Sequence, residues 1–153
     1  MRKSTILCLF IPYAIILSSV LFCRTPDGLG FGLEALKERL QTSVNLVPFH
    51  TLGSYKSAYL AGNMSSTTYY LNIYGNTVLF LPMGMMIPYL FVKKFSFFKS
   101  LVAVLLIVTF VEALQLLCGI GRADIDDIIL NFLGAVVGRV LVIEKKHKNT
   151  CSV

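Results

Sequence analysis

The chain has 153 residues, of which 56% are hydrophobic and 14% are charged. Soluble domains carry about 25% charged residues, so this composition indicates a protein that lies largely in lipid. Four apolar helices of about 20 residues each would fill roughly half of the chain, which leaves too little for a separate soluble enzyme domain. The net charge is +6, but the basic residues flank apolar runs, as in membrane proteins, and no nucleic-acid-binding motif accompanies them. We therefore expect a multi-pass cell-membrane protein whose first partner is the lipid bilayer, with no nucleic-acid partner.

Four membrane-spanning helices are predicted, at about residues 6–22, 76–92, 101–118 and 125–143. Each run is long enough to cross about 30 Å of hydrocarbon as a helix. Helices satisfy their own backbone groups in lipid, and the alternation typical of a barrel strand is absent from the sequence. The expected fold is all-α: an integral membrane four-helix bundle formed by one domain, residues 1–153.

The second predicted span contains two prolines, Pro82 and Pro88, with Gly84 between them. A proline inside a helix removes a hydrogen bond and kinks the helix. We expect a bend or a partly unwound stretch that opens space inside the bundle, although a harmless kink fits the sequence equally well.

The distribution of lysine and arginine predicts the orientation. If both termini are cytoplasmic, the basic residues close to the span ends lie mostly inside, as the positive-inside rule requires. The predicted inner set is Arg2, Lys3, Lys93, Lys94, Lys99, Lys145, Lys146 and Lys148, and the smaller outer set is Arg24, Lys37, Arg39, Lys56 and Arg122.

The first outer loop, residues 24–75, is long enough to be functional. Three leucines in it share one helical face and predict a short amphipathic helix at the membrane interface. Residues 45–49, which include Pro48, are apolar enough to dip back into the mouth of the bundle. The leucines are Leu33, Leu36 and Leu40. Just before the second predicted span, the loop also contains tyrosines that suit an outer aromatic belt, namely Tyr69, Tyr70 and Tyr74.

Glu112 lies inside the third predicted span. An ionisable side chain near the centre of a span costs about 2.5–3.5 kcal/mol on insertion scales, so it requires a partner or water. Gln115 follows at a spacing that places it on the same helix face. Both residues are expected in the outer third of the span.

Acidic residues gather at the turn into the fourth span. Asp124 is a natural N-cap, and Asp127 is favoured near the helix N-terminus by the macrodipole, so capping explains part of this group. Asn131 projects from the same face one turn below Asp127. Gly134 and Gly138 continue the stripe with a GxxxG spacing, which lets another helix approach closely.

The short turn makes the third and fourth spans antiparallel neighbours, so their polar residues are expected to meet at one depth. Asn76, at the outer entry of the second span, would join them. Arg122 would reach Glu112 or Asp124. Asp126 is left out of the expected site. The predicted binding residues are Asn76, Glu112, Gln115, Arg122, Asp124, Asp127 and Asn131.

Simpler explanations compete with a binding site. Polar pairs between helices also act as glue, worth about 0.6 kcal/mol each, but several ionisable groups in one layer favour a site. Glu112, Asp124 and Asp127 could together hold Mg²⁺ or Ca²⁺, yet the sequence carries no metal or cofactor motif, and we expect neither. His50 could act as an acid or base, although a lone loop histidine is more often simply solvated.

Five short motifs resemble, in order along the chain, the VanZ-like family of small bacterial membrane proteins. The resemblance covers roughly Asn45 to Gly138, and it includes the predicted binding residues. The founding member is linked to low-level resistance to teicoplanin, a glycopeptide that binds wall precursors outside the cell. The resemblance implies an envelope role in glycopeptide resistance and names no reaction. The motifs are Asn45-Leu-Val-Pro-Phe49, Asn76-Thr-Val-Leu-Phe-Leu-Pro-Met-Gly84, Glu112-Ala-Leu-Gln115, Gly121-Arg-Ala-Asp-Ile-Asp-Asp127 and Asn131-Phe-Leu-Gly134, and we assign structural roles to Pro48, Pro82, Gly84, Gly134 and Gly138.

Three functions follow from these patterns, and the sequence leaves all three open. The first is an outward-facing polar pocket that engages a lipid-linked wall component or the lipid-like tail of a lipoglycopeptide. The second is a membrane-embedded hydrolase or transferase that uses Glu112 or Asp127 as acid or base. The third is a small ion or solute transporter in which Glu112 carries a proton or ion.

Overall fold

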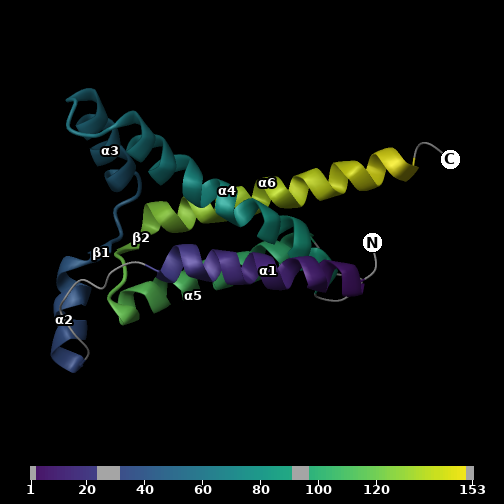
Figure 1. Ribbon diagram of the computed structural model, residues 1–153, viewed down its shortest axis with the longest axis horizontal. Coiled ribbons are helices and arrows are strands. Elements are labelled where there is room, and N and C mark those ends of the chain that lie inside the picture. Colours follow the sequence, from purple (N-terminus) through teal and green to yellow (C-terminus); the bar gives the residue numbers. More distant parts are fainter. Residues whose placement is uncertain (1–2, 24–31, 91–96, 151–153) are drawn as a thin grey trace.

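The computed structural model describes residues 3–23, 32–90 and 97–150, with side chains at 4–23, 32–90 and 97–142. This part of the chain is helical almost throughout (Figure 1). The elements, in chain order, are α1 (Lys3–Phe22), α2 (Leu33–Thr42), β1 (Val44–Asn45), α3 (His50–Leu60), α4 (Ser66–Leu90), α5 (Phe97–Cys118), β2 (Ala123–Asp124) and α6 (Ile125–Thr150).

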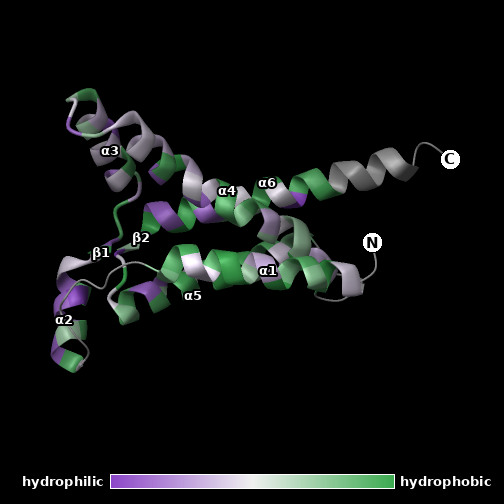
Figure 2. Ribbon diagram, in the orientation of Figure 1, coloured by the Kyte–Doolittle hydropathy of each residue, from purple (hydrophilic) through white to green (hydrophobic). Residues whose placement is uncertain are grey.

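Three of these helices are long and apolar enough to cross a membrane: α1 from Ser4, α4 and α5. Figure 2 shows mostly hydrophobic ribbons for α1 and α5 and a more mixed ribbon for α4. The expectation of a helical chain with apolar helices of membrane-spanning length is therefore confirmed for these three. The last helix, α6, has 26 residues, but Asp126, Asp127 and Arg139 make it more polar, so its crossing of the membrane stays a prediction, as does the orientation.

The α4 helix differs from the predicted second span. It begins at Ser66, well before Asn76, and continues without interruption through Pro82 and Pro88, so a partly unwound stretch is ruled out. The Tyr13 hydroxyl of α1 donates to the Leu79 carbonyl of α4 at 2.8 Å, next to the Val78 carbonyl whose helical donor Pro82 removes.

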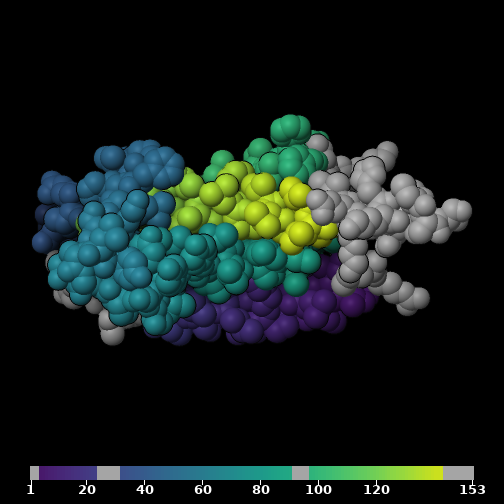
Figure 3. Space-filling model, turned by 90° about the horizontal axis from the view of Figure 1, so that it is seen from above, coloured from purple at the N-terminus to yellow at the C-terminus, as the bar shows by residue number. Residues whose placement is uncertain are grey.

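The backbones of α4 and α6 touch where they cross. A methyl group at Gly134 would overlap the carbonyl oxygen of Thr77, and one at Gly138 would overlap that of Leu81. Gly84 stands in the same relation to the Ala135 carbonyl of α6. The space-filling view from above places α6 between α4 and α5 (Figure 3). The apolar core beside this crossing consists of Leu17, Leu21, Phe80, Met83, Ile87, Val104, Val108 and Ala135.

One end of the bundle, called the loop end below, carries α2, β1, α3 and β2 (Figure 1). Here β1 pairs in parallel with β2, Val44 opposite Ala123 and Asn45 opposite Asp124. The predicted loop of residues 24–75 is thus largely helical, because α2, α3 and the first part of α4 lie within it. The sequence pattern does not predict α3, because the N-cap residue, Phe49, has no side chain that can cap a helix.

Residues 45–49 do not bury their apolar side chains in the bundle, which corrects the expectation from the sequence. Leu46 is 72% exposed, Val47 is 60% exposed and Phe49 is 65% exposed. The segment is held to the bundle through its backbone instead, because the Phe49 N–H donates to the Asp126 carboxylate of α6.

Candidate functional site

Asp124 caps α6 and also binds the loop end. Its Oδ1 accepts the backbone N–H of Asp126 at 2.9 Å, which is the N-cap that the sequence predicts. The Thr51 hydroxyl of α3 donates to its Oδ2. The Asn45 amide of β1 donates to both the Asp124 carboxylate, at 3.3 Å to Oδ1, and Thr51. Asp124 therefore has a structural role that joins three elements.

Asp126, which the sequence prediction left out, is 1% exposed. Its Oδ1 accepts the backbone N–H of Phe49 at 2.5 Å and its Oδ2 that of Leu52 at 3.0 Å. Phe49 lies in the left-handed region, with φ 63°, directly before α3. A carboxylate from a distant helix thus satisfies the free N–H groups of the α3 N-terminus, where negative charge is also favoured by the helix dipole.

Further along α6, polar side chains contact α4 and α5. The Asn76 amide of α4 donates to Asp127 Oδ1 at 2.6 Å, and Asp127 is half-buried. The Asn131 amide lies 3.5 Å from Glu112 Oε1 of α5. Glu112 is 4% exposed and Asn131 is 1% exposed. We call Asn76, Glu112, Asp127 and Asn131 the polar layer, because they join three helices near the loop end.

One atom of the polar layer lacks a partner. Asn131 Oδ1 is buried and is the one such side-chain atom without a hydrogen bond in the part of the chain with described side chains. Most buried polar atoms in native proteins are hydrogen-bonded, so an exception requires an explanation. The layer therefore holds a buried acceptor without a hydrogen bond to the described residues.

Besides Asp124, two predicted site residues lie outside the polar layer. Gln115 is buried, but its amide donates to the Leu21 carbonyl at the end of α1 at 3.0 Å. Arg122 is exposed and reaches toward the Thr42 carbonyl at 3.5 Å, not toward Glu112 or Asp124. The spacing from Glu112 predicted that Gln115 shares its helix face. The partner of Gln115, however, is determined by how α1 packs against α5. His50 is exposed on α3.

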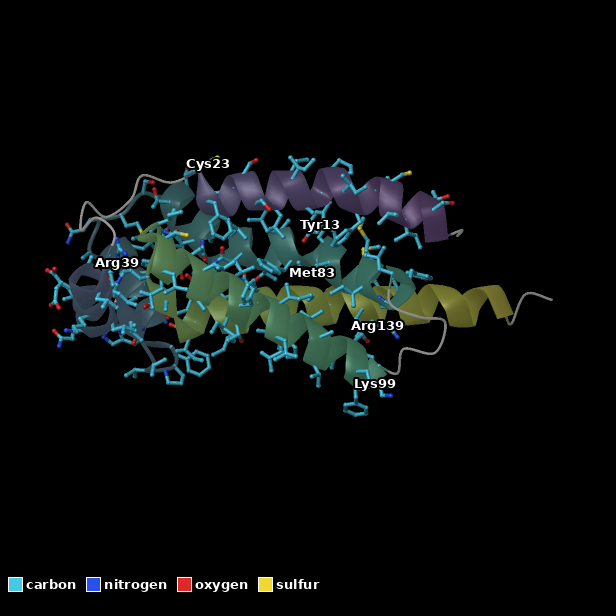
Figure 4. The ribbon with its side chains drawn as sticks, turned by 90° about the horizontal axis from the view of Figure 1, so that it is seen from below. Tyr13, Cys23, Arg39, Met83, Lys99 and Arg139 are labelled. Carbon is cyan, nitrogen blue, oxygen red and sulfur yellow. The ribbon has the colours of Figure 1, made fainter. Side chains whose placement is uncertain are left out.

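Arg39 is a buried residue that the sequence analysis placed among the outer basic residues. It is 2% exposed, and its Nη1 donates to the Leu117 carbonyl at 3.4 Å. The guanidinium lies against Gly119, which has φ 66°, so that a side chain there would overlap it. Figure 4 labels Arg39 at the loop end. A cation at the C-terminus of α5 is favoured by the helix dipole and by its free carbonyls.

The carboxylates do not form a metal centre in the described part of the chain. No group of three His, Cys, Asp or Glu residues there could hold an ion. Asp124 binds α3 and β1, Asp127 binds Asn76 and Glu112 faces Asn131. The alternative of an oxygen site built from these three carboxylates is therefore not supported by the geometry.

These features define a small helical membrane protein whose polar residues gather near one end of an apolar bundle. The chain belongs to the VanZ/LLP1 family, whose model matches residues 10–145, so the resemblance in the motifs is confirmed. It is similar to Protein VanZ of Enterococcus faecium, with 28% identity over 110 residues. That match covers 71% of this chain and 58% of the relative, less than two thirds of its length. No solved structure matches the chain.

Proposed function

We propose that this chain is a bacterial cell-envelope protein that contributes to glycopeptide protection, with teicoplanin as the first antibiotic to test. In this proposal the polar layer opens to the outside of the cell. It engages a lipid-linked wall component or the lipoglycopeptide itself. The teicoplanin link comes from the family resemblance, and the site comes from the geometry of the polar layer.

The proposed orientation has four crossings, with the loop end outside and both termini cytoplasmic. The first turn of α1 and the last turn of α6 lie toward the end of the bundle opposite the loop end (Figure 1), which supports an even number of crossings. Lys99 and Arg139 lie at that same end (Figure 4). Basic residues favour the cytoplasmic side, so this arrangement fits a cytoplasmic location for the termini.

The observation that carries the proposal is the polar layer itself. Four hydrogen-bonding side chains from three helices meet there, and burial of such groups in lipid is costly unless they have partners or a function. Asp127 is half-buried, so a ligand has access to one member of the layer. The unpartnered Asn131 Oδ1 adds a buried acceptor, which helix glue alone does not require.

The test compares teicoplanin protection by full-length variants produced at equal levels in a sensitive bacterium. Glu112→Gln and Asp127→Asn remove charge with little change of shape, and both are expected to abolish most of the protection. Glu38→Gln is the matched control, because Glu38 is an exposed carboxylate of α2. Full protection by both layer variants would refute the proposed site.

A membrane-embedded hydrolase or transferase is the second candidate. One observation favours it: Glu112 is buried whereas Asp127 is half-buried, and carboxylates in unlike environments are typical of acid–base pairs. This function predicts that purified protein turns over a lipid-linked wall precursor and that Asp127→Asn abolishes turnover. Protection without turnover would leave binding as the function. Charge-dependent flux in liposomes would instead favour the third candidate, a transporter.

A further inference from the structure

The α2 helix lies across the loop end rather than along the bundle. In Figure 1 it crosses the direction in which α1 and α5 run. If those helices cross a bilayer, a helix lying across their ends runs parallel to the membrane surface. That direction is typical of interfacial helices, which bury one apolar face at the boundary between headgroups and acyl chains.

The leucines of α2 form one face that the protein leaves largely uncovered. Leu33, Leu36 and Leu40 fall within an arc of about 60°, given about 100° of rotation per residue. Leu33 is 77% exposed and Leu40 is 53% exposed, whereas Leu36 is half-buried. Arg39, the residue that α2 buries, contacts α5 and lies about 60° from Leu36 but about 100–120° from Leu40 and Leu33, so the two exposed leucines lie on the side of the face farther from that contact.

We infer that this leucine face contacts the lipid leaflet at the loop end, and that Arg39 holds α2 in place there. An exposed apolar residue of α5 also lies at the Arg39 contact, because Leu117, whose carbonyl accepts from Arg39, is 51% exposed. The proposed contact of α2 with the interface thus lies at the end of α5, a helix that is apolar enough to cross the membrane.

Charge supports apolar contact over attraction to anionic lipid. The Lys37 ammonium lies 2.9 Å from the Glu34 carboxylate on the exposed side of α2. Glu38 is also exposed, and Arg39 is buried, so the exposed side has no basic excess. Polybasic segments are the ones that depend on anionic lipid. The contact is therefore expected in purely zwitterionic membranes as well.

The test uses single tryptophans, because the chain contains none of its own. Leu33→Trp and Leu40→Trp place the probe on the leucine face, and Glu38→Trp is the matched control on the opposite side of α2. Each full-length variant is reconstituted in phosphatidylcholine nanodiscs with and without brominated acyl chains. Acrylamide serves as the aqueous quencher, and thermal unfolding checks that each variant folds like the wild type.

Brominated lipid is expected to quench strongly the tryptophans at 33 and 40 and to spare the one at 38, whereas acrylamide gives the reverse order. Three results would overturn the inference: acrylamide quenching at 33 and 40 equal to that at 38, equal bromine quenching at all sites, or shielding of 33 and 40 from both quenchers. A need for anionic lipid would overturn the apolar mode of contact. None of these results depends on teicoplanin protection, so the two proposals fail separately.

Discussion

Asp126 and Asp127 are neighbours at the start of α6 but face different partners. Asp126 is buried and accepts two backbone N–H groups of the α3 N-terminus, whereas Asp127 is half-buried and accepts one side-chain amide from α4. The first arrangement satisfies groups that would otherwise be buried without partners. The second leaves the Asp127 carboxylate only half-buried. We therefore assign a structural role to Asp126 and the proposed binding role to its neighbour Asp127.

Asp126→Ala is expected to lower the free energy of unfolding by about 1–3 kcal/mol, because it leaves two backbone donors unpaired in a partly buried position. Thermal or denaturant unfolding in detergent measures the change. Asp126→Asn keeps one acceptor oxygen and should lie between Ala and the wild type. Glu38→Ala, an exposed carboxylate on α2, is the control, and a loss for Asp126→Ala no larger than for this control would contradict the capping role.

At the element scale, the crossing of α4 over α6 determines where the polar layer forms. Gly134 and Gly138 bring the two backbones together, and this close approach places Asn76 within hydrogen-bonding distance of Asp127, about two turns before Gly134 on α6. A side chain at either glycine must push the helices apart. The geometry of the polar layer therefore depends on residues that carry no polar group.

Gly134→Val and Gly75→Ala are expected to act in opposite directions. Valine at 134 overlaps the Thr77 backbone and should destabilise the protein by about 1–3 kcal/mol, as overpacking does. Gly75, also in a helix, has open space around it, so alanine there should stabilise by about 0.5–1 kcal/mol. Unfolding midpoints in detergent compare the two, and equal effects would show that the crossing is not tight.

Arg39 fixes α2 to the C-terminus of α5, so Arg39→Leu is expected to release α2 while the membrane helices stay folded. Hydrogen exchange of the α2 backbone should rise, with little change in α5. Lys37→Leu is the control, because Lys37 is exposed and pairs within α2. Unchanged protection of α2 in Arg39→Leu would show that other contacts hold the helix.

Local patterns predicted the apolar helices and the Asp124 cap, because each depends on spacing within one helix. They also named the four residues of the polar layer among seven candidates, although the layer itself depends on how α4, α5 and α6 pack. They did not predict α3, whose N-terminus is satisfied by Asp126 from a distant part of the chain. The partner of Gln115 likewise belongs to α1. The burial of Arg39 was also missed, because its partner, the Leu117 carbonyl, is distant in the sequence. An arginine on a short helix is usually solvated.

At the scale of the whole molecule, the proposal requires that α6 crosses the membrane despite its charged first turn. The Asp126 carboxylate is bound by α3, and Asp127 is bound by α4, so the two charges have partners near the interface. At the other end, Arg139 donates to the Ser100 hydroxyl of α5 at 3.1 Å. Paired polar groups near its ends make a crossing by α6 physically acceptable.

Labelling of single cysteines from outside intact cells tests this topology. Gly75→Cys, in open space near the loop end, is expected to react with a membrane-impermeant maleimide. The native Cys151, kept alone in a second variant, is expected to react only after the cells are permeabilised. Labelling of Cys151 from outside would mean that α6 does not cross the membrane or that the orientation is reversed.

The exchange of the two residues in the Asn76–Asp127 pair tests the role of the polar layer most directly. Teicoplanin protection is measured for Asp127→Asn, for Asn76→Asp and for the double variant, at matched protein levels. If the layer binds as a unit, each single variant loses protection and the double variant regains part of it, because an amide again faces a carboxylate. Wild-type protection by Asp127→Asn alone would contradict the account.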